Sequence, residues 1–285
     1  MDSVAGRVVL ITGGGTGIGL GIAQVLAQAG ARVVITGRTR ATLDAAAERL
    51  TAAGHDVRAY ELDVTDRAAW QRTVESVTSD LGPVQVLVNN AGVSTLGLRF
   101  DEITPQLWDD VIATNLHGVY NGVHAVLDGM RGAGGGHIVN VSSMAGLMAV
   151  RRLAPYVTSK FAVVGLSEVL RLELADDGIG VSVVCPGGVR SQLWRTSRKI
   201  RGLPDTDVPP DEVGSQSAFA STAPEDVGVE VLAGILEDRL YVFTHPEYGP
   251  RVAERGRRID DAFADAQLRK SGSTPDRAGT PAVPQ

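Results

Sequence analysis

Two side chains capable of acid–base chemistry, Tyr156 and Lys160, are four positions apart in the sequence. The apolar run that follows them, residues 161–166, predicts a buried helix, on which this spacing places both side chains on nearly the same face. Because a cation favours the phenolate form of a neighbouring phenol, such a pair is suited to proton transfer near neutral pH. The same spacing is common among exposed residues without function, so the pair needs support from its surroundings.

A pair of serines lies upstream of these two residues. Ser142 and Ser143 close the apolar segment 138–141, which is typical of a β-strand. A hydroxyl at the end of a strand and a Tyr–Lys pair on the next helix can meet at one edge of a sheet, and the earlier part of the chain indicates what would bind there.

A glycine-rich run, residues 13–19, joins a predicted strand to a predicted helix. The strand is the apolar segment 7–12, and the helix is indicated by Ile22, Val25 and Leu26 at helical spacing. In this context the bare backbone amides can approach an anion at the positive end of the helix. The run therefore predicts a phosphate-binding turn, and the alternative is an ordinary glycine-rich loop.

The residues after the second predicted strand, 32–36, bear on which dinucleotide the turn would accept. An acidic side chain there would hydrogen-bond a ribose 2′-hydroxyl and repel a 2′-phosphate. The chain has Gly37, which leaves room, and Arg38, which can make a bidentate contact to phosphate. This favours NADP(H) over NAD(H), unless Arg38 is only a solvated charge. Arg40 could share the phosphate or simply begin the next helix.

Strand-like and helix-like segments alternate along the chain. A parallel sheet with helices covering both faces is the expected result of this alternation. The apolar segments that predict strands are residues 7–12, 32–36, 57–62, 84–88, 138–141, 179–185 and 240–243.

A long helix is predicted to begin at Thr104 and to carry Asn115 on its apolar stripe. A buried amide needs partners, so Asn115 is either a structural residue or part of a proton path. His117 and His124 lie on the same helix. Because no third ligand accompanies them, we expect no metal site.

Composition excludes several classes of protein. The 285 residues are 44% hydrophobic and 21% charged, as in an ordinary globular protein, and the net charge of −6 argues against nucleic acid as a partner. The single cysteine, Cys185, rules out an internal disulfide and suits a reducing compartment. The apolar pattern that begins by Val8 leads us to expect no cleavable leader, and no apolar run approaches the length that spans a bilayer. The expected location is therefore cytoplasmic, without a membrane.

We expect one domain over residues 1–268. Within it, the stretch 192–223 is rich in Pro, Gly, Ser and Asp and predicts an irregular substrate loop or lid. Its apolar side chains would close over a substrate or would serve as plain packing. Residues 269–285 predict a disordered tail.

Taken together, these motifs resemble the short-chain dehydrogenase/reductase family, in its compact single-domain branch. The resemblance covers about residues 5–245 and rests on the glycine run after Thr12, the segment 89–92, Asn115, Ser143 and the segment 156–160. Ser143 precedes Tyr156 by 13 positions, which is the separation that this family uses. The resemblance implies a Rossmann-type, doubly wound, parallel seven-stranded sheet with helices on both faces.

The resemblance also implies roles for individual residues. Tyr156 would exchange a proton with a carbonyl or alcohol oxygen, Ser143 would orient that oxygen, and Lys160 would bind the nicotinamide ribose and stabilise the phenolate. Asn115 would hold a water that links Lys160 to solvent. The residues implied in cofactor binding, besides Tyr156 and Lys160, are Gly13, Thr16, Gly17, Ile18, Gly19, Arg38, Asp63, Val64, Asn89, Ala91, Gly92, Pro186, Gly187, Val189 and Ser191.

The expected function is an oxidoreductase that interconverts a small, hydrophobic secondary alcohol and a ketone, with NADP(H) preferred and NAD(H) possible. Thr16 stands where many NADP-preferring relatives carry a basic residue, so the preference depends on Gly37 and Arg38. A non-catalytic NADP(H)-binding regulator and an isomerase or epimerase on the same fold are the alternatives. The apolar faces of the Tyr156 helix and of the helix near Thr104 predict a homodimer or homotetramer.

Overall fold

The computed structural model describes residues 1–95, 97–191, 193–203 and 221–271. The contacts within the chain divide it into two compact units, Met1–Pro246 and Glu247–Gln285. The predicted single domain of residues 1–268 crosses this division, and its limits stay a prediction.

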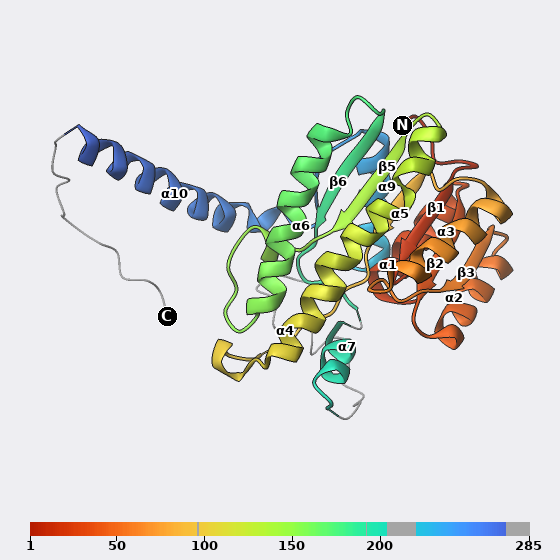
Figure 1. Ribbon diagram of the computed structural model, residues 1–285, viewed down its shortest axis with the longest axis horizontal. Helices are drawn as coiled ribbons and strands as arrows, with labels where there is room; N and C mark the ends of the chain where they lie inside the picture. Colours follow the sequence, from red (N-terminus) through yellow and green to blue (C-terminus); the bar gives the residue numbers. More distant parts are fainter. Residues whose placement is uncertain (96, 192, 204–220, 272–285) are drawn as a thin grey trace. The chain divides into compact units, whose positions relative to one another are not determined.

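Within the described residues, the first unit is built on a seven-stranded sheet with the order β3-β2-β1-β4-β5-β6-β7 (Figure 1). Each neighbouring pair of strands is parallel. The strand bounds are β1 (Val8–Thr12), β2 (Arg32–Gly37), β3 (Val57–Glu61), β4 (Val86–Asn89), β5 (Gly136–Val141), β6 (Ile179–Cys185) and β7 (Tyr241–Phe243). The predicted doubly wound parallel sheet is confirmed.

Helices cover both faces of this sheet, and each face has its own hydrophobic core. On one face, α1 (Gly17–Gln28), α2 (Arg40–Ala52) and α9 (Pro224–Leu236) pack side chains such as Ile22, Leu43 and Val231 against the strands. On the other face, α3 (Arg67–Leu81), α5 (Gly118–Gly132) and α6 (Ala154–Glu173) contribute Trp70, Val126 and Leu170. Strands buried from both sides read as continuous apolar runs, which is why they were visible in the sequence.

The strand order reverses between β1 and β4. The chain winds from β1 outward to β3, then crosses back to β4 and winds outward to β7. In sheets of this kind, ligands bind beyond the carboxyl ends of the strands at such a reversal. The glycine turn follows β1 and the segment 89–92 closes β4, so both lie at this point.

The helix predicted from Thr104 changes its hydrogen-bond pattern partway along, although the chain stays helical throughout. It begins at α4 (Pro105–Ile112), where the Thr104 hydroxyl accepts a hydrogen bond from the backbone nitrogen of Leu107, and it continues into α5. Between them, residues Ala113–His117 form a π-helical turn that contains Asn115. A π turn inserted in a helix is often found at a functional site.

Two expectations about irregular segments need correction. Part of the predicted lid forms the helix α7 (Leu193–Ile200), while residues 192 and 204–220 lie outside the described residues. The predicted tail begins too early, because α10 (Gly249–Lys270) includes residues 269 and 270; residues 272–285 are outside the described residues.

The remaining short elements are 3-10 turns, namely Phe100–Glu102, Met144–Gly146 and Pro246–Tyr248. None of the described helices combines the length and the hydropathy that crossing a bilayer requires.

Candidate active site

The glycine turn connects β1 to the N-terminus of α1. Gly13 and Gly17 have φ angles of +64° and +52°, in the left-handed region that favours glycine. A Cβ at Gly19 would lie 2.3 Å from the Gly13 carbonyl oxygen, so only glycine lets the turn close on itself. Thr16 precedes α1 without capping it through its side chain, and the first turn holds no acidic residue. The amides at this helix end are therefore suited to an anionic ligand.

Thr12 and Asn90 hold this turn against the end of β4. The Thr12 hydroxyl accepts hydrogen bonds from the backbone nitrogens of Asn90 (2.9 Å) and Ala91 (3.0 Å). In return, the Asn90 amide donates to the backbone oxygens of Thr12 (2.9 Å) and Gly13 (3.3 Å). The two loops that flank the strand reversal are thus one hydrogen-bonded unit.

A cavity of about 330 Å³ opens beside the turn, along the carboxyl ends of the strands. Most of the residues implicated by the sequence line it. These are Gly13, Thr16, Gly17, Ile18, Arg38, Asp63, Val64, Ala91, Gly92, Tyr156, Lys160 and Ser191.

Other predicted site residues do not line this cavity. They are Gly19, Asn89, Asn115, Ser143, Pro186, Gly187 and Val189. Asn89 is buried and its amide donates to the side chain of Asn140 at 2.9 Å, so it links β4 to β5. The Gly187 amide donates to Nδ1 of His245 at 3.1 Å, and Val189 bridges to Thr222. These contacts give the segment after β6 a structural role near the cavity.

Sequence reasoning did not assign several residues that do line the cavity. Arg195 and Thr196 come from α7, Thr114 comes from the π turn, and Ser142 comes from the end of β5. Ser142 is the neighbour of the chosen Ser143, and Arg195 lies within the expected lid of residues 192–223.

The hydroxyl and amino groups expected to do chemistry come together at the start of α6. The side chain of Ser143 lies close enough to the Tyr156 phenol to lower its pKa through hydrogen bonding, and the amine of Lys160 lies 5.6 Å from the centre of the Tyr156 ring. Lys160 is buried, and its Nζ donates to the backbone oxygen of Val141 at 2.8 Å. Tyr156 is half-buried because its ring lines the cavity.

Burial controls the proton affinity of these groups. It raises the pKa of the Tyr156 phenol, while the hydrogen bond with Ser143 opposes that rise. It lowers the pKa of the Lys160 ammonium to about 8. A lowered pKa was expected for Tyr156; in this structure burial is the largest effect on the phenol and raises its pKa, and the hydrogen bond with Ser143 is the effect that opposes the rise. A phenol that stays protonated is ready to donate a proton to a carbonyl oxygen in the direction of reduction.

Asn115 supports α6 from the π turn. Its amide nitrogen donates to the backbone oxygen of Val93 (2.9 Å) and to the hydroxyl of Ser159 (3.0 Å), and its oxygen accepts from the backbone nitrogen of Val93 (2.8 Å). Ser159 in turn donates to the backbone oxygen of Tyr156 at 2.8 Å. Asn115 is thus connected through Ser159 to the turn of helix that presents Tyr156 and Lys160.

The two arginines after β2 have different surroundings. Arg38 is exposed and lines the cavity together with Gly37 and Thr39. Arg40 begins α2 and forms an ion pair with Asp44, with 2.8 Å between Nη2 and Oδ1. Arg40 thus begins the helix, as one of the two expectations had it, and it does not line the cavity.

The residues present fit a dinucleotide. The glycine turn offers backbone amides at a helix end, and any side chain at Gly13 would be strained and would meet Asn90 and Ala91 at 3.0–3.1 Å. The cavity continues from this turn past Asp63 and Val64 on one side to Tyr156 and Lys160 on the other. These residues would hold the phosphates, the adenine end and the nicotinamide end of such a molecule.

Comparison with known proteins identifies the family. The model of the family described as short chain dehydrogenase matches residues 7–201. The "Monensin polyketide synthase putative ketoacyl reductase" of Streptomyces virginiae is 41% identical over 201 residues, which cover 70% of this chain and 77% of that protein. The D-beta-hydroxybutyrate dehydrogenase of Cupriavidus necator is 32% identical over 238 residues, covering 76% of this chain and 91% of that protein.

Solved structures agree with this result. A short chain dehydrogenase/reductase from Burkholderia phymatum in complex with NAD has a TM-score of 0.83 at 28% identity and covers 98% of this chain and 100% of its own. A single-residue variant of the actinorhodin polyketide ketoreductase with NADPH has a TM-score of 0.74 at 34% identity, covering 85% of this chain and 96% of its own. The chain belongs to the short-chain dehydrogenase/reductase family and is an NAD(P)-dependent oxidoreductase.

Proposed function

We propose that this protein is an NADPH-dependent reductase that converts a small, apolar ketone to a secondary alcohol, and that it catalyses the reverse reaction with NADP. The observation that carries this proposal is the position of Tyr156 and of the buried amine of Lys160 on a cavity continuous with the glycine turn, with Ser143 close to the Tyr156 phenol. The alternatives of a non-catalytic regulator and an isomerase have no comparable observation in their favour.

Each of the three side chains has one task in this mechanism. The nicotinamide, when bound, supplies or accepts the hydride. The Tyr156 hydroxyl donates its proton to the substrate oxygen during reduction and accepts one during oxidation. The Ser143 hydroxyl donates a hydrogen bond to the same oxygen and orients it. The Lys160 ammonium compensates the charge that develops on the phenol and, in addition, would bind the nicotinamide ribose.

Asn115 acts through its neighbours in this proposal. Both hydrogens of its amide nitrogen are used on Val93 and Ser159, so that nitrogen has no hydrogen left for a water. Its oxygen accepts one bond from Val93 and retains a second lone pair. We therefore assign Asn115 to positioning the start of α6, and a water that relays protons to Lys160 would have to use the remaining lone pair or the backbone.

The preference for NADP(H) is supported by the end of β2. Arg38 lines the cavity beside Gly37 and Thr39, and β2 is not followed by an acidic residue that would repel a 2′-phosphate. The Arg38→Ala variant is expected to raise the Kd of NADPH by about 10-fold to 100-fold, because a charge-assisted hydrogen bond is lost, with little change for NADH.

Fluorescence titration of both cofactors measures this preference. The Arg40→Ala variant is the matched control, since Arg40 is held by Asp44 and should leave both affinities unchanged. Tighter binding of NADH than of NADPH to the unmodified protein would overturn the preference. An equal loss of affinity for both cofactors in Arg38→Ala would show that Arg38 does not cause the preference.

The substrate class is supported by the relatives and by the cavity. The names of the two relatives denote a ketoacyl reductase and a hydroxybutyrate dehydrogenase, and both imply a ketone and hydroxyl pair. Leu193 and Arg195 line the cavity, so an apolar ketone that carries an anionic group fits the chemistry of the wall. A panel of ketones with and without a carboxylate, monitored by nicotinamide absorbance with NADPH, tests this assignment; no oxidation of NADPH with any ketone would overturn it.

The oligomeric state and the location remain part of the proposal. Tyr120 on α5 and Val169 and Leu172 on α6 are 47%, 49% and 80% exposed, which supports a homodimer or homotetramer through these helices. Light scattering of the intact chain would establish the number of subunits. A cytoplasmic location is supported by the single buried cysteine.

A further inference from the structure

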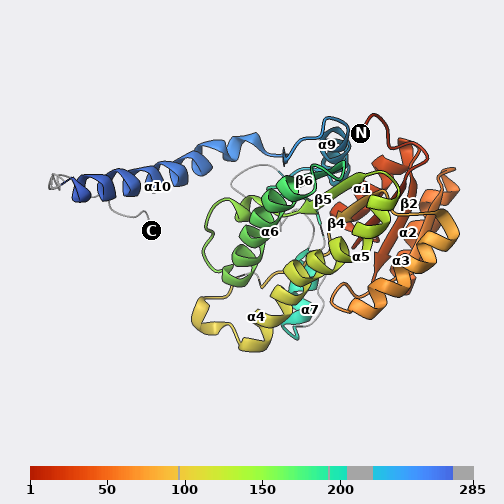
Figure 2. The ribbon, with the colours of Figure 1, turned by 45° about the horizontal axis from the view of Figure 1, so that its top comes forward.

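The segment that follows β6 is paired with a later part of the chain. After β6 the described chain forms α7 and, farther on, α9, which covers one face of the sheet (Figure 2). Just before α9, Thr222 forms a β-bridge with Val189. The backbone nitrogen of Thr222 donates to the oxygen of Gly188 at 2.9 Å, and the backbone nitrogen of Arg190 donates to the oxygen of Thr222 at 3.1 Å. The pairing ends next to Ser191, which lines the cavity.

One buried imidazole, that of His245, contacts both sides of this pairing. His245 follows β7 and is 2% exposed. Its Nδ1 accepts a hydrogen bond from the backbone nitrogen of Gly187 at 3.1 Å, and its Nε2 lies 3.3 Å from the Thr222 hydroxyl. A backbone N–H can only donate, so Nδ1 carries no proton and the hydrogen of the neutral ring is on Nε2, where it donates to Thr222. The Thr244 hydroxyl, 2.7 Å from Nδ1, is a second donor to that atom.

The same segment is also bound by the turn that carries Ser143. The backbone nitrogen of Met144 donates to the oxygen of Pro186 at 2.9 Å, and the Ser143 hydroxyl donates to the same oxygen at 3.5 Å. Pro186 immediately precedes Gly187, the residue that His245 holds. A displacement of Gly187 would therefore affect the turn of Ser143 as well as the pairing beyond it.

We propose that His245 is a positioning residue for the nicotinamide end of the cofactor, because it holds the segment that presents Ser191 to the cavity. This inference rests on the proposed function, in which the nicotinamide lies at the Tyr156 end of the cavity. His245 is not among the residues that line the cavity, so it acts through the segment and not by touching the cofactor. The contact with Gly187 is the more important of the two, since its loss leaves a buried backbone N–H without its acceptor.

Three replacements of His245 separate the two contacts. In His245→Asn the side-chain oxygen takes the place of Nδ1 and accepts from Gly187, while the contact with Thr222 is lost. In His245→Gln the longer amide can still donate to Thr222, and the acceptor for Gly187 is lost. His245→Ala loses both contacts and provides a second variant without the Gly187 acceptor. The matched control is His137→Gln, since His137 is also a buried histidine whose Nε2 contacts a hydroxyl, but it does not line or adjoin the cavity.

Calorimetric titration with two ligands measures the effect, and circular dichroism confirms that each variant is folded. The first ligand is the nicotinamide cofactor that the unmodified protein binds more tightly, and the second is the ADP-ribose part of that cofactor, which lacks the nicotinamide. His245→Gln and His245→Ala should raise the Kd of the complete cofactor by about 5-fold to 10-fold, the value of one hydrogen bond, and leave that of the ADP-ribose part within about twofold. His245→Asn and His137→Gln should bind both ligands within about twofold of the unmodified protein.

Three results would overturn the proposal. The first is an unchanged Kd of the complete cofactor in His245→Gln and His245→Ala. The second is an equal loss of affinity for both ligands, which would indicate a general loosening of the fold. The third is a loss in His245→Asn as large as that in His245→Gln, because the contact with Gly187 would then have no effect. The titrations need no substrate, so they are independent of the ketone panel, in which a failure of the proposed function would be seen.

Discussion

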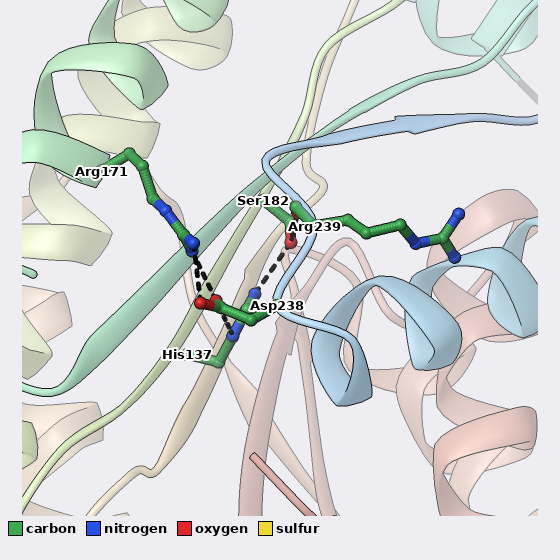
Figure 3. A network of polar contacts seen from close by, with 5 residues as sticks. All are labelled: His137, Arg171, Ser182, Asp238 and Arg239. Atoms are coloured by element: carbon green, nitrogen blue, oxygen red, sulfur yellow. Dashed lines mark hydrogen bonds and ion pairs between the residues drawn. The ribbon is translucent and has the colours of Figure 1, made fainter.

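Two polar clusters lie along the strands β5 and β6 and the helix α6, one near the carboxyl ends of the strands and one nearer their amino ends. The two clusters differ in how they use hydrogen bonds. The cluster at the carboxyl end contains Ser143, Tyr156 and Lys160 beside the cavity. The cluster at the amino end contains His137 of β5, Ser182 of β6 and Arg171 of α6, together with Asp238 before β7 (Figure 3).

The amino-end cluster is closed on itself. Arg171 forms a bidentate pair with Asp238, with 2.7 Å between Nη2 and Oδ2. The Ser182 hydroxyl donates its one hydrogen to the backbone oxygen of Arg239 at 2.6 Å, so Nε2 of His137 must be the donor in its 2.8 Å contact with Ser182. Nδ1 of His137 lies 3.8 Å from Asp238. This network joins β5, β6, α6 and the chain leading to β7.

Burial acts on both clusters, with different consequences. It lowers the pKa of His137 to about 4, so that the imidazole is neutral under physiological conditions. It lowers the pKa of Lys160 to about 8, so that the amine exchanges its proton near neutral pH. Burial thus keeps His137 of the amino-end cluster in its neutral form, whereas it brings the pKa of Lys160 in the carboxyl-end cluster close to neutral pH. The comparison predicts that changes at the carboxyl end alter turnover and that changes at the amino end alter stability.

The largest expected effect is the loss of turnover in Tyr156→Phe. Removing the proton donor should lower kcat by about 10²-fold to 10⁴-fold, the usual contribution of a positioned acid–base group. NADPH affinity and thermal unfolding should change little, because the ring remains in place. Steady-state kinetics with the ketone identified in the panel measures the effect.

Tyr60→Phe is the control for that variant. Tyr60 belongs to the edge strand β3, away from β5 and β6, and its hydroxyl donates to Asp80 at 2.5 Å. Its loss should therefore leave kcat unchanged. Near-normal turnover in Tyr156→Phe would remove the distinction between the two clusters.

The sequence was sufficient for the sheet and for much of the carboxyl-end cluster. The glycine turn and the pair Tyr156 and Lys160 are defined by short spacings along the chain, which can be recognised in a single sequence. The amino-end cluster was not predicted, because His137, Arg171, Ser182 and Asp238 are far apart along the chain and have no common motif. Their meeting depends on the register of β5 with β6 and on the return of the chain to β7.

The sequence also did not predict the local geometry of the helix around Asn115 or the direction of the Tyr156 pKa shift. The π turn around Asn115 changes the hydrogen-bond pattern of a helix without changing its apolar periodicity, so the sequence predicted one regular helix. The pKa of Tyr156 was expected to fall because Lys160 is four positions away, yet burial raises it. Spacing identifies the partners, and only the surrounding protein determines which effect is larger.

The second prediction concerns stability at acidic pH. An unfolded histidine has a pKa near 6.5, so between that value and about 4 the unfolded chain binds a proton that native His137 does not. The free energy of unfolding should therefore fall as the pH decreases through this window, by at most about 3 kcal/mol. Asp238, whose pKa is lowered chiefly by its hydrogen bond with Arg171, adds a further loss at lower pH.

Urea unfolding of His137→Gln at several pH values isolates the histidine contribution. The variant should lose most of the dependence between pH 6.5 and 4, because glutamine can still donate to Ser182 but does not titrate. The same change at the exposed His124 should leave the wild-type dependence intact. An equally steep loss of stability in His137→Gln would assign the acid sensitivity to other groups, and a large drop in its kcat near neutral pH would contradict the separation of the two clusters.

The smallest expected effect separates two serines on α6 that are nearly equivalent in structure. Ser159 and Ser167 are both fully buried. Ser159 donates to the backbone oxygen of Tyr156 (2.8 Å) and accepts from Asn115 (3.0 Å), and Ser167 donates to Val163 (2.7 Å) and accepts from Asn140 (2.9 Å). Replacing either by alanine removes the same kind of hydrogen bonds and should lower stability by about 1–2 kcal/mol.

Only Ser159→Ala should change catalysis, because only Ser159 connects the π turn to the helical turn that presents Tyr156 and Lys160. We expect kcat to fall by about tenfold and the pH dependence of kcat to shift, since small displacements of a positioned acid reduce its efficiency. Ser159→Thr, which retains the hydroxyl, should recover part of the loss. If Ser159→Ala and Ser167→Ala have the same kcat and the same pH profile, Ser159 contributes to packing alone and the link from Asn115 to Tyr156 has no role in positioning the proton donor.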